Sequence, residues 1–160
     1  MIHYLFKDEI TFNNFCSNVN KYLDINGYLI ITTFDANLIN NLFLNNNTTH
    51  SEYFNNNDNN QEKFFEIIKK YDTINLQNFG LKIDVNVSIF MKEDEYNSEY
   101  LVEPDFLIKK LNEKCNLRLI ETELFINIYK NYKKYFINNY ENNSKYNNIK
   151  NLYNINNSEI

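Results

Sequence analysis

The chain has 160 residues, of which 43% are apolar and 16% aromatic, a composition that suits one folded domain and excludes a fully disordered protein. Two Gly and one Pro leave little material for a glycine-rich phosphate loop, and no dinucleotide or P-loop fingerprint is present. A net charge of -5 argues against a free-standing nucleic-acid binder, because phosphate contacts require a clustered basic surface.

Three elements are predicted in the first part of the chain. A helix begins near Asp8 or Thr11 and ends before Gly27, because apolar residues recur there at spacings of three and four. Residues 28–34 are uncharged and rich in β-branched side chains, which predicts a strand buried on both faces of an α/β sheet. Asp35 then starts a second helix, whose inward-facing residues are expected to be Leu38, Leu42 and Phe43.

The middle of the chain is less regular. Residues 45–60 are rich in Asn and are predicted to form a mobile loop, since their apolar area is too small to offset the entropy of ordering. Residues 64–71 form either a strand or a short helix, because periodicity does not separate the two. Residues 81–90 alternate apolar and polar side chains, which predicts a half-buried antiparallel strand.

The last part continues the alternation. Residues 104–114 are predicted to form a helix with Pro104 in its first turn, residues 117–125 a strand, and residues 126–137 an aromatic helix. The fold class is therefore α/β with antiparallel end strands, in one domain over residues 1–137. The Asn-rich residues 138–160 are expected to be a flexible tail.

Two cysteines and the apolar runs limit the class of protein further. Cys16 and Cys115 are far apart and lack a CxxC spacing or a nearby His, so we expect buried thiols, no metal site and no disulfide framework. The sequence has no run of about 18 apolar residues. We therefore expect a cytoplasmic protein without a membrane partner.

Candidate functional residues fall in four places, and each has a structural alternative. Thr32, Thr33 and Asp35 follow the predicted strand, where open α/β sheets bind ligands, but Asp35 is equally suited to cap the next helix. The pair His3 and Tyr4 precedes the first helix, where a His is usually structural or exposed.

Glu99 and Tyr100 lie between an acidic loop and an apolar pair. Such a Glu is usually solvated, but an enclosed carboxylate suits guanine, because it accepts hydrogen bonds from the ring N–H and the exocyclic amine. Lastly, Lys130, Lys133 and Lys134 alternate with Tyr129, Tyr132 and Tyr135, a pattern that fits either RNA contact or a solvated helix face.

The segments IHYLF, NVNKYL, NGYLIITTFD and SEYLVEPDFLIKKLNEKCNLRLIETELF occur in an order that resembles one family. They are similar to the carboxyl-terminal half of the mRNA cap guanine-N7 methyltransferases, and the viral members look closest, as in poxvirus capping enzymes. The resemblance covers residues 2–129. It implies the carboxyl-terminal half of a class I S-adenosylmethionine-dependent methyltransferase, which is a Rossmann-like fold.

By this resemblance, His3 and Tyr4 border the cap guanine of the mRNA, Glu99 reads its Watson–Crick edge and Tyr100 packs beside it. Guanine N7 attacks the methyl group of S-adenosylmethionine directly, so no catalytic side chain is expected. The family's donor-binding half has no counterpart in this sequence.

Three functions remain open. The chain is the cap-binding part of a methyltransferase, made as a separate chain or from a split or truncated gene. Alternatively, it is a catalytically inactive methyltransferase-like subunit that binds and stabilises a second capping-enzyme chain. The third possibility is a gene fragment without present activity.

Overall fold

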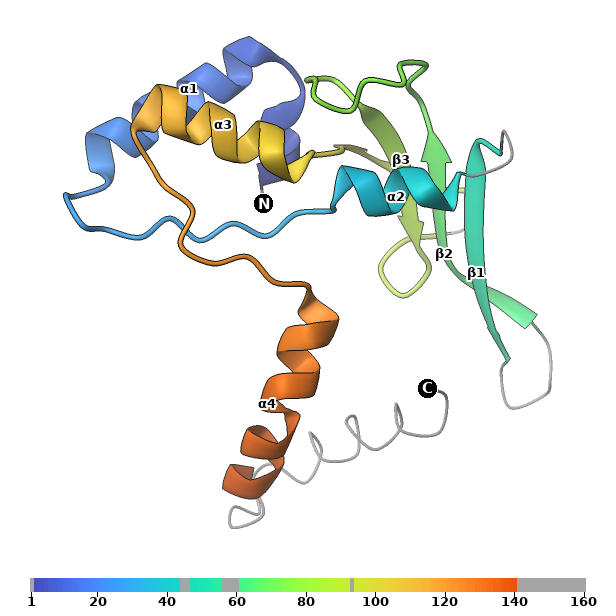
Figure 1. Ribbon diagram of the computed structural model, residues 1–160. Helices are drawn as coiled ribbons and strands as arrows, with labels where there is room; N and C mark the ends of the chain where they lie inside the picture. Colours follow the sequence, from blue (N-terminus) through green and yellow to red (C-terminus); the bar gives the residue numbers. More distant parts are fainter. Residues whose placement is uncertain (1, 44–46, 56–60, 93, 141–160) are drawn as a thin grey trace. The chain divides into compact units, whose positions relative to one another are not determined.

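The computed structural model describes residues 2–43, 47–55, 61–92 and 94–140. The chain divides into two compact units, Met1–Arg118 and Leu119–Ile160, and each is described by itself. The first unit contains a sheet and four helical segments, which lie beside and across the sheet (Figure 1).

The sheet of the first unit is an antiparallel meander of four strands in the order β1-β2-β3-β4. Its strands are β1 (Thr49–Asn55), β2 (Gln61–Lys69), β3 (Lys82–Val87) and β4 (Asn97–Tyr100). The register of β3 and β4 pairs Ile83 with Glu99, which places this carboxylate beside a fully buried apolar residue. Each strand is hydrogen-bonded to the next strand along the chain, a local topology that needs no crossover.

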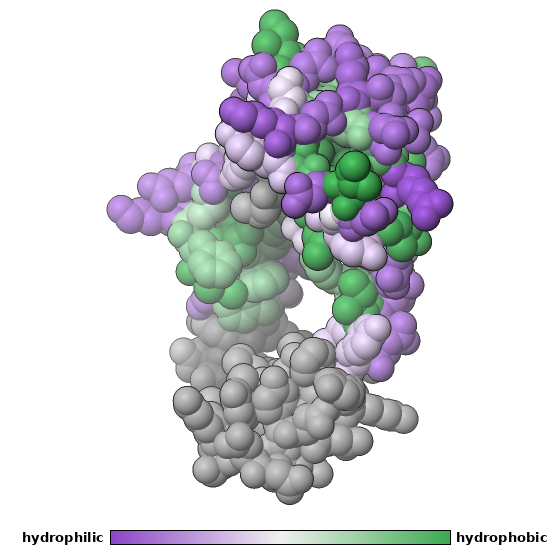
Figure 2. Space-filling view, turned by 90° about the vertical axis from the view of Figure 1, so that its left-hand side faces the viewer, coloured by the Kyte–Doolittle hydropathy of each residue, from purple (hydrophilic) through white to green (hydrophobic). Residues whose placement is uncertain are grey.

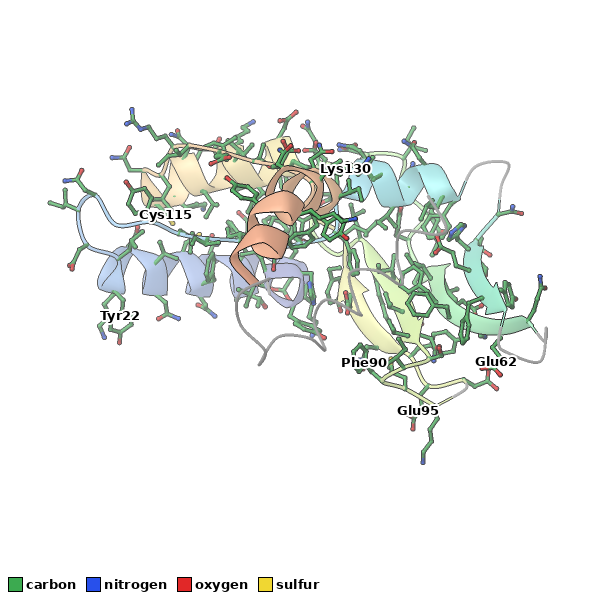
Figure 3. The ribbon with its side chains drawn as sticks, turned by 90° about the horizontal axis from the view of Figure 1, so that it is seen from below. Tyr22, Glu62, Phe90, Glu95, Cys115 and Lys130 are labelled. Carbon is green, nitrogen blue, oxygen red and sulfur yellow. The ribbon has the colours of Figure 1, made fainter. Side chains whose placement is uncertain are left out.

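Helix α2 (Ala36–Leu42) covers one face of the sheet, as Figure 1 and the view from below in Figure 3 show. Ala36 and Phe43 are buried against the side chains of β2, β3 and the end of β4. The core residues under this helix are Ile67, Tyr71, Leu81, Ile83, Val85 and Leu101. Burial raises the pKa of Tyr71 to about 12, and its hydroxyl donates a hydrogen bond to Asn40 Oδ1 at 2.9 Å.

A second core forms between α1 (Glu9–Tyr22), α3 (Pro104–Cys115) and the short 3₁₀ helix η1 (Ile2–Phe6). Its centre is aromatic: Phe6 and Phe12 are fully buried, with ring centroids 5.1 Å apart in an edge-to-face arrangement. In Figure 3, Cys115 lies at the end of α3, and its thiol is 3.8 Å from the carbonyl oxygen of Cys16. Tyr22, by contrast, is an exposed residue at the end of α1.

Side-chain caps define where the helices of the first unit begin. Asp8 accepts a hydrogen bond from Thr11 N at the start of α1, and Asp35 accepts from the first backbone N–H groups of α2. Glu103 caps α3 in the same way, by accepting from Phe106 N. Asn116 follows the last residue of α3 and caps the helix. Its φ of 53° lies in the left-handed region, which Asn tolerates better than most residues. The polar residues at these termini therefore satisfy backbone groups that the helices leave open.

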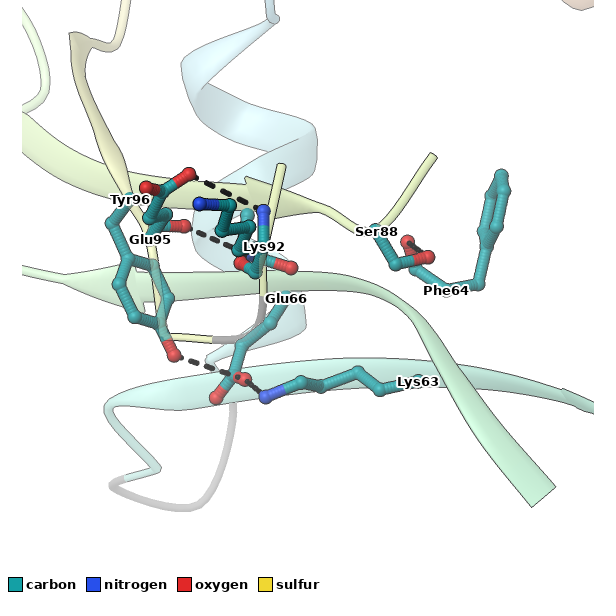
Figure 4. Close-up of polar contacts among 8 residues, drawn as sticks. Lys63, Phe64, Glu66, Ser88, Lys92, Glu95 and Tyr96 are labelled. Carbon is teal, nitrogen blue, oxygen red and sulfur yellow. Dashed lines mark hydrogen bonds and ion pairs between the residues drawn. The ribbon is translucent and has the colours of Figure 1, made fainter. Parts of the chain in front are cut away.

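The β3–β4 loop is held by a buried polar cluster (Figure 4). Glu66 of β2 forms an ion pair with Lys63 and accepts a hydrogen bond from the hydroxyl of Tyr96 at 3.3 Å. Behind it, the fully buried amide of Asn86 donates to the carbonyl oxygens of Lys92 and Glu95 at 3.0 and 2.6 Å. These bonds tie Lys92 and Glu95 to β3 and so help to place β4.

The second unit contains α4 (Phe125–Tyr140). Glu123 accepts hydrogen bonds from Leu124 N at 2.9 Å and from Asn127 Nδ2 at 2.6 Å, and these bonds lower the pKa of its carboxyl. The ammonium of Lys133 lies over the ring of Tyr129, 5.4 Å from its centroid. The predicted domain boundary at residue 137 stays a prediction, because most of the predicted tail, residues 141–160, lies outside the described residues.

Several predicted elements are confirmed. Helices α1, α3 and α4 occupy the predicted segments, and α2 begins after Asp35. The alternating run at 81–90 contains β3, and the ambiguous run at 64–71 belongs to β2. The α/β class is correct, with an antiparallel sheet, whereas the Rossmann-like arrangement stays a prediction.

Two predicted strands are wrong. Residues 28–34 are extended but join no sheet, and Tyr28 and Ile30 are exposed on one side, so the run is not buried on both faces. Residues 117–124 are also outside any strand, and α4 begins at Phe125. A strand requires a hydrogen-bonded neighbour, and within the described ranges neither segment has one along its length.

Other predictions failed for local reasons. The Asn-rich segment 45–60 was predicted to be a loop, but it contains β1, because pairing with β2 satisfies the backbone despite the polar side chains. Of the residues expected to face inward from α2, Leu38 and Leu42 are exposed and only Phe43 is buried. The buried face of this two-turn helix runs through Ala36, Ile39 and Phe43 at spacings of three and four.

Candidate functional site

The 3₁₀ helix η1 places His3 in the first unit. Phe6, at the end of η1, is fully buried in the aromatic core, and its carbonyl oxygen accepts a hydrogen bond from Gly80 N at 2.9 Å. Gly80 adopts a φ of 77°, a left-handed conformation that favours glycine, and a Cβ there would lie 3.3 Å from the carbonyl oxygen of Lys7. This turn and the Phe6 ring hold η1 against the segment that enters β3.

His3 faces Glu99 across the junction between η1 and β4. The distance from His3 Nε2 to Glu99 Oε2 is 3.6 Å, and the two side chains are only 3% and 13% exposed. Both of these atoms are buried without a hydrogen-bond partner among the described residues. Because buried polar atoms are almost always paired in folded proteins, a buried donor and acceptor that face each other unpaired mark a candidate ligand site.

Burial changes the protonation of both groups. It lowers the pKa of His3 and raises the pKa of Glu99, so both shifts favour the neutral forms. The distance of 3.6 Å is within ion-pair range but too long for a hydrogen bond. We therefore interpret the contact as two desolvated groups that lack a partner rather than as a formed ion pair. A ligand that donates to Glu99 would compensate the desolvation of its carboxylate.

Aromatic rings border this pair. The ring of Tyr4 is 4.3 Å from that of His3, and Tyr4 is 45% exposed. Phe34, which lies just before α2, stacks on the ring of His3, with centroids 6.3 Å apart and an interplanar angle of 26°. The His3–Glu99 pair therefore has aromatic surface beside it. Sequence reasoning did not assign Phe34 to the site, although it stands next to the noted Thr33 and Asp35.

The other residues that the sequence singled out as functional candidates lie outside the His3–Glu99 pair. Tyr100 follows Glu99 in β4 and packs against the helical core, so its contact with a ligand stays a prediction. Asp35 caps α2, and its backbone forms a parallel bridge with Val102, which supports the structural alternative for this residue. Lys130 is exposed on α4, whereas the side chains of Lys134 and Tyr135 lie outside the described ones.

The structure also places the two cysteines and the potential metal ligands among the described residues. Cys16 is buried, and burial together with the neighbouring Cys115 thiol raises the pKa of Cys16 to about 12. In the part of the chain that the structure describes, no three His, Cys, Asp or Glu side chains gather closely enough to hold a metal ion. Across the same residues, no helix is both long and apolar enough to span a membrane.

The resemblance implies S-adenosylmethionine, so we tested whether the residues present fit this donor. A hollow of about 170 Å³ lies between η1, α1 and the extended segment, and Thr32 is the polar side chain in its lining. The other lining residues are Ile2, Leu5, Phe15, Leu29, Ile30 and Ile31. Sites for molecules of this size usually measure about 300–1,000 Å³ and contain placed polar groups. The hollow is too small for the donor and has Thr32 as its one polar side chain, so we derive no reaction step through it.

The first unit thus defines an α/β domain with an enclosed, unpaired His–Glu site beside aromatic rings. Comparison with known proteins adds one finding about its relatives. Over 139 residues, or 87% of this chain, the sequence is 43% identical to a probable mRNA-capping enzyme of Acanthamoeba polyphaga mimivirus. The matched segment is 12% of the mimivirus protein, so the chain spans a small part of that relative. No protein-family model matches the chain.

Proposed function

We propose that this chain is the guanine-binding part of an mRNA cap guanine-N7 methyltransferase. The observation that carries the proposal is the Glu99 carboxylate, whose Oε2 atom is buried without a hydrogen-bond partner and lies 3.6 Å from His3 Nε2. Guanine presents two adjacent donors, the ring N–H and the exocyclic amine, and a carboxylate accepts both at once. The similarity to a segment of a probable mRNA-capping enzyme supports the coarser part of this assignment, a role in mRNA capping.

In this proposal each residue has a binding role. Glu99 accepts the two guanine hydrogen bonds, while His3 borders the carboxylate on its buried side. Tyr4 and Phe34 supply aromatic surface for the base. The methyl donor would be S-adenosylmethionine, held by residues outside those that line the apolar hollow. The chain's own contribution is to bind and orient the base, which lowers the entropic barrier to transfer.

The first experiment is a calorimetric titration of the purified chain with the cap analogues GpppA and ApppA, which differ in the capping base. We expect GpppA to bind and ApppA to bind at least about tenfold more weakly, because adenine presents an acceptor where guanine presents the ring N–H. Equal affinity for the two analogues would contradict guanine recognition. A parallel titration with S-adenosylhomocysteine should give no binding, since the hollow does not fit the donor.

The binding of GpppA should also depend on pH. Burial raises the pKa of Glu99 from its ordinary value of 4.5, so the free protein takes up a proton at this carboxyl as the pH falls. The protonated group loses its capacity to accept two hydrogen bonds. The affinity is therefore full above the raised pKa and falls below it by about tenfold per pH unit. Titrations between pH 4.5 and 8 check this dependence, and a flat profile would argue against Glu99 as the acceptor.

A second candidate function is a catalytically inactive subunit that stabilises a capping-enzyme partner. The extended segment 28–34, which joins no sheet and exposes apolar side chains, favours this alternative. If the titrations show no preference for guanine while the folded chain binds a capping-enzyme partner, the second candidate replaces the first.

A further inference from the structure

We propose that Cys16 and Cys115 form an oxidation site, in which a peroxide joins the two thiols in a disulfide that ties α1 to α3. Both thiols are free in the structure, and the chain has two cysteines in all. The site is independent of the proposed function, because its oxidation does not require that the chain binds guanine.

The packing of α1 on α3 brings the two cysteines together, although they are 99 positions apart in the sequence. The thiol sulfur of Cys115 lies 3.8 Å from the carbonyl oxygen of Cys16. One turn further along α1, Asn20 Nδ2 donates to Lys114 O at 2.9 Å, which holds the residue before Cys115 against α1. A disulfide spans Cα atoms about 4.4–6.8 Å apart, so it forms between helices in direct contact, as these are.

The two thiols differ in their access to solvent. Cys16 is 3% exposed in the helical core, whereas Cys115, the last residue of α3, is half-buried. Figure 2 faces the side on which α1 and α3 end, and apolar surface shows there between hydrophilic residues. Burial, together with the neighbouring Cys115 thiol, raises the pKa of Cys16 to about 12, so this sulfur stays protonated at neutral pH. A small uncharged peroxide therefore oxidises Cys115 first.

The oxidation has two balanced steps. The sulfur of Cys115 attacks one oxygen of hydrogen peroxide, the O–O bond breaks, and the thiol proton leaves with the other oxygen as water. The sulfur of Cys16 then attacks the sulfur of the resulting sulfenic acid, which forms the S–S bond and breaks the S–O bond. The proton of Cys16 leaves with the hydroxyl group as a second water. The thiols lose two electrons in total, and the peroxide takes them up.

The disulfide makes the stability of the first unit depend on its oxidation state. It closes a loop that runs from α1 to the end of α3 and includes the whole sheet. Cross-linking a loop of about 100 residues lowers the entropy of the unfolded chain and so stabilises the fold. Because η1 packs in the same core as Cys16, the cross-link also braces the element that carries His3.

The test exposes the purified chain to hydrogen peroxide, removes the excess with catalase and blocks the remaining thiols with N-ethylmaleimide. We expect no maleimide on either cysteine and a Cys16–Cys115 cross-link in the peptide map, which also separates any oxidised methionine. Dithiothreitol should restore both thiols. Oxidation that stops at a sulfinic acid on Cys115, or a disulfide between two copies of the chain, would overturn the proposal.

Two variants make the test specific. Cys115→Ser should leave Cys16 as a free thiol under the same treatment, because the buried sulfur is not reached by the peroxide. The matched control adds Glu113→Cys to Cys115→Ser, which moves the thiol to an exposed position about 200° around α3. This thiol should not cross-link to Cys16. If it does so as readily as Cys115, the disulfide forms without the packing of α1 on α3 and the proposal is wrong.

A second measurement follows the stability of the fold. The urea midpoint of the oxidised chain should lie about 1–2 M above that of the same sample with dithiothreitol, because the cross-link constrains the unfolded chain. Peroxide treatment of Cys115→Ser should leave the midpoint unchanged. An oxidised chain with an unchanged midpoint would contradict a lock between the helices. Failure to bind GpppA would remove the proposed function and leave the oxidation site intact.

Discussion

Replacing Glu99 with Ala is expected to weaken the binding of GpppA by about tenfold to a hundredfold, because hydrogen bonds to a charged group contribute about 1.5–3 kcal/mol. Glu99→Gln should lose nearly as much, since its amide accepts one guanine hydrogen bond and opposes the other with its own N–H. Calorimetric titration of the two variants measures both effects. Unchanged affinity in Glu99→Ala would remove the basis of the proposed function.

The same substitutions should affect folding in the opposite direction. Burial raises the pKa of Glu99, so the folded protein binds this proton more tightly than the unfolded chain does, and the ionised carboxylate costs stability above the raised pKa. Glu99→Gln removes that charge, and at pH 7 it should raise the free energy of unfolding by about 1 kcal/mol. Urea denaturation checks the value.

A matched control for Glu99→Gln is Glu121→Gln, because Glu121 is exposed and lies in the second unit. We expect this variant to keep both the affinity for GpppA and the stability of the unmodified chain. A gain of stability together with a loss of binding is typical of a residue retained for a ligand. If Glu99→Gln instead lowers the stability, the carboxylate has a structural role that the geometry around His3 does not explain.

The second large effect is expected for Phe6→Ala. Phe6 is fully buried, and its ring contacts those of Phe12, Phe79 and Phe106 with centroid distances of 5.1 to 6.2 Å. Truncation removes these contacts and leaves a cavity, so the free energy of unfolding should fall by about 3–5 kcal/mol. Urea denaturation followed by far-ultraviolet circular dichroism measures the loss.

Phe6→Leu tests whether this ring also positions the site. Leu keeps most of the apolar volume, so the variant should fold with a smaller loss of stability. Because Phe6 ends η1, the substitution should still shift His3 relative to Glu99 and weaken GpppA binding. Phe106→Leu is the control, since Phe106 belongs to the same aromatic group but is a residue of α3 and not of η1. Equal affinities of the two variants for GpppA would show that the Phe6 ring does not position His3.

Much of the helical structure was predictable from local chemistry. Asp8 and Asp35 are side-chain caps, and the apolar spacing from Phe12 to Val19 gives α1 its buried face. The alternation around Ile83 likewise predicted β3. These features depend on residues within one or two turns of each other, so no information from distant parts of the chain was needed.

The other strands of the sheet were harder to predict than β3, because pairing overrides composition. The polar segment Thr49–Asn55 forms β1 because β2 lies next to it. The apolar segment 28–34 forms no strand, because no described strand lies beside it to accept or donate backbone hydrogen bonds. β4 is only four residues long and lacks a clear alternation of apolar and polar residues. The sequence therefore predicted that Glu99 lies between an acidic loop and an apolar pair, and not in a strand. Intrinsic strand preference is a weak predictor when the partner strand is unknown.

By itself, the sequence determined the α-helices of this protein and its α/β class. Through a family resemblance it also predicted guanine contacts for His3, Tyr4, Glu99 and Tyr100, which stay a prediction. Only the tertiary structure decided that His3 and Glu99, which are 96 positions apart, face each other at 3.6 Å without other partners. Helix caps and apolar periodicity act between near neighbours and can be read from the chain. The pairing of buried polar groups depends instead on which distant segments pack together, and here the packing of η1 against β4 creates the site.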